Sequence, residues 1–240
     1  MLSESSLKDI VKKLQTTEVN IFREYFQHLF LSNLYQFEDA NKIFFKGGTA
    51  LRIIYNSPRF SEDLDFTADI KLFRLKNLLE KVISKISLEG QQIKTLESKP
   101  TSGGFFAIYE TIIYSIPVRI ELNISLRKKQ NKIISNKHLI SNPFIPSYTV
   151  VALADSFLVK EKVEALLTRQ KPRDFFDLYF ILRNRLCIND IVPYQKHIIE
   201  VVSKQNEKSL VKELKVFLPK IYWNMLDNFI ERIIFELKRI

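Results

Sequence analysis

Cysteine, histidine and long apolar runs are scarce in this sequence of 240 residues. The single cysteine, Cys187, excludes an internal disulfide, and the three histidines show no ligand spacing that would indicate a zinc site. The longest apolar stretch, from Thr149 to Val159, is interrupted by Asp155 and is shorter than the roughly 18 residues that a membrane span needs. Because no charged-then-apolar leader is visible, we expect a cytoplasmic protein with no membrane partner.

Positive charge is abundant and unevenly distributed. The chain carries 37 Lys and Arg against 27 Asp and Glu, and residues 71–140 hold 13 of the basic but only 5 of the acidic residues. The densest basic group follows a predicted strand in a polar loop and comprises Arg127, Lys128, Lys129, Lys132 and Lys137. A concentrated positive surface favours a polyanionic partner such as RNA. Lysine-rich surfaces can also be no more than solvated, and charge alone leaves that alternative open.

The hydrophobic pattern predicts an α+β fold, a mixed sheet with flanking helices, followed by a helical domain. Apolar residues recur at helical spacing over 5–14, 18–35 and about 71–87. Thr16 and Thr17 form a break and a cap between the first two helices. A short helix is also predicted, capped by Thr49 and ending at Tyr55. Strands are predicted at 43–45, 63–66, 92–97, 105–116 and 118–124. From Val150 onward the pattern is helical, and Pro172 suits the first turn of a helix. We therefore expect a mixed α/β domain over 1–148 and a helical domain over 149–240.

Two aspartates form the first candidate site. Asp63 and Asp65 are two residues apart on a predicted strand, so both carboxylates point to one face. At ~6.6 Å they would repel by roughly 2.5 kcal/mol at an effective dielectric of ~20, a cost that a shared divalent ion would reverse. Oxygen ligands select magnesium or manganese. If the strand that carries Glu121 lies alongside, three carboxylates can hold metal ions for phosphoryl transfer, although acids on exposed strands are also common surface residues.

A paired glycine precedes these aspartates. In Lys46-Gly47-Gly48-Thr49 a predicted strand ends at two glycines and a hydroxyl residue that begins a helix, which lets backbone N–H groups approach a phosphate. The spacing is not that of a Walker P-loop. A Gly-Gly turn alone is more often structural, but its position shortly before Ser61-Glu62-Asp63-Leu64-Asp65-Phe66 makes the pattern much more specific.

Two blocks of sequence resemble a known family. Phe45–Arg52 (FKGGTALR) with Arg59–Phe66 (RFSEDLDF), and Glu161–Arg169 (EKVEALLTR) with Arg173–Tyr179 (RDFFDLY), are similar to the bacterial AbiEii/AbiGii abortive-infection toxins. These toxins belong to the DNA polymerase β-like nucleotidyltransferases. The resemblance therefore implies a nucleotidyltransferase-like catalytic domain over 1–148 and a helical domain over 149–240 that closes the nucleotide cleft. The resemblance extends from about residue 40 to 185. It implies the toxin of a type IV toxin–antitoxin pair, with a nucleoside triphosphate as substrate, a cognate antitoxin as partner, and RNA as acceptor, since some members transfer a nucleotide onto tRNA ends.

The resemblance also implies a division of labour among the candidate residues. Gly48, Thr49 and Ser61 would hold the triphosphate, beside Lys46 and Gly47, while Asp63 and Asp65 would bind the metal. Glu121 would occupy the third-carboxylate position, where an aspartate is more usual. In the second block Lys162 would contact phosphate and Asp177 would orient groups at the reacting centre.

The second block has a physical interpretation of its own. Lys162, Arg169 and Arg173 would bring positive charge to a bound triphosphate. Structural alternatives remain, because Asp174 in the first turn after Pro172 complements the helix dipole and Arg173 and Asp177 have the spacing of a surface ion pair. The aromatic residues of this block, Phe175, Phe176 and Tyr179, are predicted to lie in the core.

These observations support a magnesium-dependent nucleotidyltransferase in which an acceptor hydroxyl attacks the α-phosphorus of a nucleoside triphosphate. Two alternatives stay open. The first is a catalytically silent nucleotide- or RNA-binding module, which would be expected to lose one of the aspartates. The second is a kinase-like phosphotransferase that uses the same cleft.

Overall fold

The computed structural model describes residues 3–126 and 133–240, and the chain divides into two compact units. The first unit comprises Met1–Asn56 and Phe60–Leu153, and the second comprises Ser57–Arg59 and Ala154–Ile240. Four residues of the predicted basic loop, at positions 127, 128, 129 and 132, lie outside the described residues. Lys137, the fifth, lies on a strand and is exposed.

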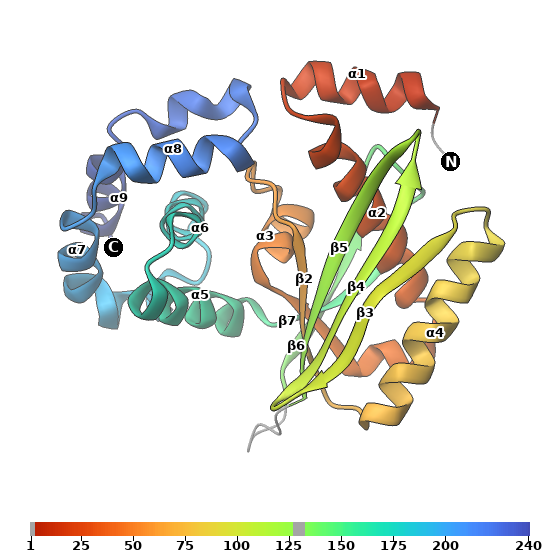
Figure 1. The fold of residues 1–240 in the computed structure, drawn as a ribbon. Helices are drawn as coiled ribbons and strands as arrows, with labels where there is room; N and C mark the ends of the chain where they lie inside the picture. The colour runs from red at the N-terminus through yellow and green to blue at the C-terminus, as the bar shows by residue number, and fades with distance from the viewer. Residues whose placement is uncertain (1–2, 127–132) are drawn as a thin grey trace. The chain divides into compact units, whose positions relative to one another are not determined.

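The first unit is built on one mixed sheet of seven strands, in the order β3-β4-β5-β2-β1-β7-β6 (Figure 1). Two neighbouring pairs, β2 with β5 and β1 with β7, are parallel, and the other pairs are antiparallel. The parallel pairing places β2 in the middle of the sheet, although it is only the second strand along the chain. The strands are β1 (Ile43–Lys46), β2 (Asp63–Ala68), β3 (Ile93–Thr101), β4 (Gly104–Ile113), β5 (Ile116–Ser125), β6 (Ser135–Ile140) and β7 (Tyr148–Leu153).

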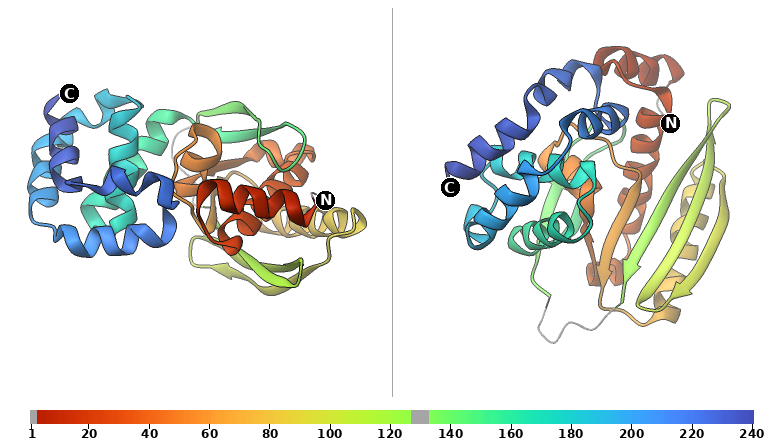
Figure 2. Two further views of the ribbon diagram at one scale, coloured as in Figure 1. Left: turned by 90° about the horizontal axis from the view of Figure 1, so that it is seen from above. Right: turned by 60° about the vertical axis from the view of Figure 1, so that its left-hand side comes forward.

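Helices cover the apolar face of this sheet. After α1 (Glu4–Leu14), helix α2 (Glu18–Leu34) packs on β5 and β7, and α4 (Leu72–Leu88) packs on β3 and against α2 (Figures 1 and 2). The rings of Phe30 on α2 and Tyr109 on β4 are stacked with centroids 6.0 Å apart. Alternate residues of β5, such as Ile120 and Leu122, are fully buried on this face, whereas Glu121 between them is exposed. The strand period therefore separates a core face from a polar face.

The second unit is a bundle of helices around α6 (Pro172–Arg183). Figure 1 shows α6 end-on, and it contacts α5 (Asp155–Arg169), α8 (Glu207–Phe217) and α9 (Phe229–Lys238), while α7 (Gln195–Ser203) packs on α9. Every residue from position 174 to position 182 of α6 is buried, including the aromatic residues predicted to be core. Over the described part of the chain, the helices are too short or too polar to cross a membrane.

Several local predictions are confirmed. Thr17 caps α2 by accepting a hydrogen bond from the backbone N–H of Asn20 at 3.3 Å, and Pro172 occupies the first turn of α6. The predicted strands and the helix near residues 71–87 are present with small shifts at their ends. The mixed α/β fold class is likewise confirmed, with strands and flanking helices in the first unit.

The prediction that the chain is helical from Val150 was wrong. Residues 148–153 form β7, and the strand β6 that precedes it was not predicted. Strand β7 lies between β1 and β6 in the sheet. Residues 150–153 are all buried, so the strand shows no alternation of buried and exposed positions. The predicted cap at Thr49 was also wrong, because α3 (Gly47–Tyr55) begins two residues earlier and Lys46 occupies its N-cap position.

A buried histidine makes the stability of the first unit depend on pH. His28 on α2 is 4% exposed, and its Nδ1 lies 2.7 Å from the Tyr148 hydroxyl. Burial, assisted by the positive charge of Arg52, lowers the pKa of His28 to about 3. The ring is therefore neutral in the folded protein at pH values where it is protonated in the unfolded chain.

The free energy of unfolding should fall as the pH drops from 6.5 towards 3, because the unfolded chain binds a proton there that the folded protein excludes. Between pH 6.5 and 4.5 the loss from His28 should be roughly 2–3 kcal/mol. Urea denaturation across this range should show a shallower pH dependence for His28→Gln. The exposed His197→Gln is the matched control and should behave as wild type; equal slopes in both variants would contradict the assignment.

Candidate active site

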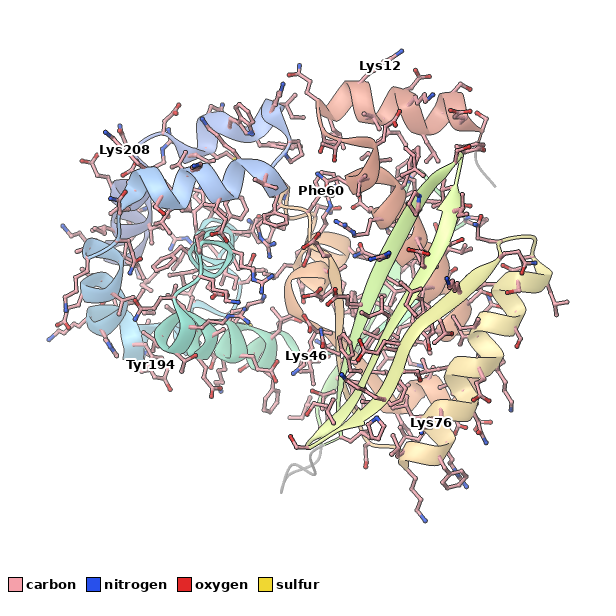
Figure 3. The ribbon with its side chains drawn as sticks, in the orientation of Figure 1. Lys12, Lys46, Phe60, Lys76, Tyr194 and Lys208 are labelled. Carbon is pink, nitrogen blue, oxygen red and sulfur yellow. The ribbon has the colours of Figure 1, made fainter. Side chains whose placement is uncertain are left out.

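The glycine pair brings backbone and carboxylate into contact. Lys46, labelled in Figure 3, ends β1, and Gly47 begins α3 with a φ of +84°. A Cβ atom added at Gly47 would lie 2.2 Å from Oδ2 of Asp65. Glycine is therefore required at this position both for its backbone conformation and for the space that the Asp65 side chain fills. The predicted paired glycine and the predicted acidic strand thus meet at one point.

The acidic residues lie in neighbouring rows on the polar face of the sheet. Because β2 and β5 are parallel neighbours, Asp63 is in register with Glu121 and Asp65 is in register with Asn123. The two aspartates are half-buried and Glu121 is exposed. Within residues 3–126 and 133–240, no three His, Cys, Asp or Glu side chains are grouped closely enough to hold a metal ion. The strands are therefore adjacent as the sequence analysis required, whereas a closed three-carboxylate cage is not preformed.

Helix α2 and the first turn of α3 fix the start of β2. The Nε2 group of Gln27, which is 2% exposed, donates hydrogen bonds to the backbone carbonyls of Ser61 at 2.9 Å and Glu62 at 3.2 Å. The Thr49 hydroxyl donates to the backbone carbonyl of Asp63. Because these hydrogen bonds are made to backbone carbonyls at positions 61–63, they fix the start of β2 without using the carboxylates of Asp63 and Asp65.

Ion pairs also hold the segment that precedes β2. Arg23 on α2 pairs with Glu62 at 2.9 Å. Arg52 on α3 binds Glu24 on α2 through two hydrogen bonds of 2.6 and 2.9 Å, and its guanidinium carbon lies 3.8 Å from the ring centroid of Phe60, labelled in Figure 3. Bidentate, largely buried arginine–carboxylate pairs are geometrically specific. The sequence analysis did not identify these supporting residues. A local signal was present in the polar residues Glu24 and Gln27, which lie among the apolar residues of a predicted helix.

A pocket opens beside Asp65 on the polar face. It has a volume of about 340 Å³ and is lined by Lys46, Asp65, Phe106, Asn123 and the turn at residues 101–103, among others. All of its lining residues belong to the first unit. The residues that sequence analysis assigned to triphosphate and metal in the first half of the chain lie around β1, β2 and the start of α3, except Glu121, which lies on β5; of these, Lys46 and Asp65 line the pocket.

The second unit contains a buried charge cluster of its own. Arg59 donates to Asp177 through Nε at 3.0 Å and Nη2 at 2.8 Å, and Lys162 Nζ donates to the other carboxylate oxygen at 2.7 Å. Arg59, Lys162 and Asp177 are 3%, 8% and 1% exposed. Burial by itself would raise the pKa of Asp177, but the two adjacent cations outweigh it and hold the pKa below its usual value. The carboxylate therefore remains ionised between two cations.

The neighbouring residues of the second block have structural partners. Asp174 is fully buried; it accepts hydrogen bonds from Arg169 at 2.6 and 2.8 Å and from the backbone N–H of Lys171 at 3.1 Å, which closes the start of α6. The possible surface pair of Arg173 with Asp177 was wrong, because Asp177 is buried and binds Arg59 and Lys162 instead. Arg173 itself is half-buried in the first turn of α6.

A mixed sheet that presents two aspartates on a central strand, next to a glycine turn that opens a helix, is the arrangement expected of a nucleotidyltransferase. A family model of the nucleotidyl transferase AbiEii toxins of type IV toxin–antitoxin systems matches residues 29–238. The chain therefore belongs to this family and is a nucleotidyltransferase, as the sequence blocks predicted. A comparison with curated protein sequences found no match.

Solved structures share the fold. The nucleotidyltransferase toxin MenT4 from Mycobacterium tuberculosis is 15% identical, with a TM-score of 0.65 over 100% of this chain and 91% of that one. A candidate nucleotidyltransferase from Helicobacter pylori is 21% identical, with a TM-score of 0.56 over 99% of this chain and 98% of its own. JHP933 from Helicobacter pylori is 22% identical, with a TM-score of 0.52 over 100% and 96% of the two chains.

Substitutions at two glycines should distinguish the cost of backbone strain from the effect of displacing the Asp65 carboxylate. Gly47→Ala must strain a backbone at φ +84° and also displace the Asp65 carboxylate. Gly90→Ala is the matched control, because Gly90 has φ +94° and no atom within 4 Å of an added Cβ. Thermal unfolding should show a loss of about 1–2 kcal/mol from backbone strain in Gly90→Ala, and a larger loss in Gly47→Ala because the Asp65 side chain must also move. Only Gly47→Ala should lose nucleotide transfer, and equal activities would refute the contact.

Removing the Asp177 charge should destabilise the second unit more than removing either cation. Asp177→Asn leaves Arg59 and Lys162 buried without a counter-charge, at a cost of about 3–5 kcal/mol, whereas Arg59→Met leaves one balanced pair. Hydrogen exchange of the α6 amides should report the larger loss. The exposed Asp227→Asn is the matched control and should change stability by less than about 0.5 kcal/mol; a larger effect for Arg59→Met than for Asp177→Asn would contradict this ordering.

Proposed function

We propose that this nucleotidyltransferase transfers a nucleoside monophosphate from a nucleoside triphosphate to an RNA acceptor such as tRNA, with magnesium as its metal, and that a cognate antitoxin restrains it. The observation that carries the proposal is the placement of Asp63 and Asp65 on one face of β2, with Gly47 against the Asp65 carboxylate. Family membership supports the reaction class and the toxin–antitoxin setting.

The residues on the polar face fit magnesium, or manganese, as a ligand set. Asp63 and Asp65 offer carboxylate oxygens from alternate positions of one strand, and Glu121 lies in register with Asp63. Magnesium is commonly held by one or two carboxylates together with substrate phosphates rather than by a complete protein cage. The lack of a preformed group of three acidic side chains among the described residues is compatible with such a site. When bound, a divalent ion would stabilise charge on the attacking and leaving oxygens.

The triphosphate is proposed to bind at the start of α3. The first turn of this helix presents backbone N–H groups at Gly47 and Gly48, and Lys46 lies directly before it. Anions are favoured at a helix N-terminus for both hydrogen bonding and electrostatic reasons. Thr49 is buried with its hydroxyl bound to the Asp63 carbonyl, so we assign it to positioning the aspartate strand. Ser61 stays a proposed triphosphate ligand.

The reaction follows from these positions. The oxygen of an acceptor hydroxyl forms a bond to the α-phosphorus, the bond between that phosphorus and the bridging oxygen breaks, and pyrophosphate leaves with the electron pair. The hydroxyl proton is released to water. Asp63 and Asp65 would hold the metal, and Glu121, in register with Asp63, is proposed as the third carboxylate.

The second unit is proposed to contribute through Asp177. Its carboxylate holds Arg59 and Lys162, and Arg59 precedes the aspartate strand by only four residues. The phosphate contacts proposed for Lys162, Arg169 and Arg173, and the placement of Asp174 near the nucleotide, rest on the family resemblance. Closure of the nucleotide cleft by this unit is proposed on the same ground.

Labelled nucleotide distinguishes the proposed reaction from its alternatives. Incubation with each α-labelled triphosphate and total RNA should place label in RNA. A binding module would transfer no label, and a kinase-like enzyme would transfer only label from the γ-phosphate. Either result would overturn the proposal.

Asp63→Asn and Asp65→Asn should each reduce transfer by at least a thousandfold while leaving thermal stability within about 1 kcal/mol, since both side chains are half-buried on the polar face. The matched control is Asp69→Asn, an exposed aspartate just beyond the end of β2. It should retain wild-type transfer. Wild-type activity in either site variant would mean that the metal assignment is wrong.

A further inference from the structure

One row of registered residues crosses five strands through Asp65. Lys99 on β3 pairs with Phe106 on β4, Phe106 with Asn123 on β5, Asn123 with Asp65 on β2, and Asp65 with Lys46 on β1. Residues in register on neighbouring strands point to the same face of a sheet. Phe106 is therefore on the same face as the aspartates, separated from Asp65 by a single strand.

The hairpin between β3 and β4 brings its turn close to this row. A Cβ added at Gly104 would lie 1.9 Å from the backbone carbonyl oxygen of Ile124, so the hairpin sits directly against the end of β5. The turn at residues 101–103, together with Phe106, Asn123 and Asp65, lines the pocket of about 340 Å³. This volume lies within the range of small-ligand pockets and matches one nucleoside better than a folded macromolecular surface.

The chemistry of the lining is that of a nucleoside site. Phe106 is half-buried and offers an aromatic face, and Lys99 Nζ, which also pairs with Glu97, lies 5.8 Å from the Phe106 ring centroid. Asn123 supplies amide donors and acceptors between the ring and the aspartate. Aromatic rings beside basic and amide groups on a sheet are how proteins commonly bind unpaired RNA bases.

Lys46 lines the end of the pocket beside the proposed triphosphate site, and the direction of the reaction assigns the rest of the pocket, around Asn123 and Phe106, to the other substrate. The proposed triphosphate site lies at the start of α3, on the β1 side of Asp65, whereas Asn123 and Phe106 extend from Asp65 in the opposite direction along the sheet. In an in-line displacement the attacking hydroxyl and the leaving pyrophosphate lie on opposite sides of the α-phosphorus. The attacking group should therefore arrive from the β4–β5 side.

We infer that this pocket receives the terminal nucleoside of a single-stranded RNA acceptor end, with its base stacked on Phe106 and its sugar near Asn123. The inference rests on the proposed function, because it uses the proposed position of the triphosphate. It adds to that proposal a named acceptor subsite and predicts that an unpaired terminal nucleotide is required. Phe106 is a specificity-determining residue in this scheme, and Lys99 supports the ring from the edge of the sheet.

Kinetic measurements on the full chain test the subsite. Phe106→Ala should raise the KM for the RNA acceptor by about 5- to 150-fold, the equivalent of one base stacked on an aromatic ring, and leave the KM for the triphosphate unchanged. Phe106→Trp should restore the acceptor KM to within a few-fold of wild type. Phe73→Ala removes an exposed aromatic ring from α4 and is the matched control, expected to behave as wild type. An acceptor KM that Phe106→Ala leaves unchanged would overturn the inference, as would an increase confined to the triphosphate KM.

Direct binding separates failure of the subsite from failure of the proposed reaction. Fluorescence anisotropy with a labelled single-stranded RNA oligonucleotide, without triphosphate, should show at least fivefold weaker binding for Phe106→Ala and unaltered binding for Phe73→Ala. This result in a protein that transfers no α-label would support the subsite and refute the proposed reaction. Normal transfer by wild type, combined with equal RNA affinity of wild type and Phe106→Ala, would refute the subsite alone. A thermal melt of each variant confirms that it is folded.

Discussion

The active face depends on the contact between the Asp65 carboxylate and a glycine that has no side chain. Any Cβ at Gly47 would occupy the space of Asp65 Oδ2, so the same atom-scale fit sets the backbone of the first turn of α3 and the orientation of the Asp65 carboxylate, the proposed metal ligand. The N–H groups proposed to bind the triphosphate are therefore tied to the oxygens proposed to bind the metal. A phosphate and its metal require that proximity, because their charges are neutralised by different parts of the protein within a few ångströms.

The parallel pairing of β2 with β5 determines what surrounds this contact. It places Glu121 beside Asp63 and Asn123 beside Asp65, although the strands are far apart along the chain. Strand β4 pairs with the other edge of β5, with Phe106 in register with Asn123. Phe106 therefore belongs to the row of registered residues that begins at Lys46. In the proposed reaction, a triphosphate on one side of the aspartates and an acceptor on the other would both follow from this one sheet order.

Local sequence patterns predicted the parts of this site but not their supports. Alternation identified the shared face of Asp63 and Asp65, and the glycine pair identified the turn, because both signals are contained in a few consecutive residues. Gln27 and Arg59 act across 34 and 118 positions, and no spacing rule connects them to their partners. Strand β7 was missed for a related reason: a strand buried on both faces has no alternating pattern, and only its neighbours in the sheet distinguish it from a helix.

The path of the chain before β2 shows where these long-range contacts of Gln27 and Arg59 act. Residues 57–59 belong to the second unit, while the residues before and after them belong to the first. Arg59 is held by Asp177, and only four residues later the chain begins the aspartate strand. The hydrogen bonds of Gln27 to the carbonyls at 61 and 62 lie within the first unit and fix the chain directly before Asp63.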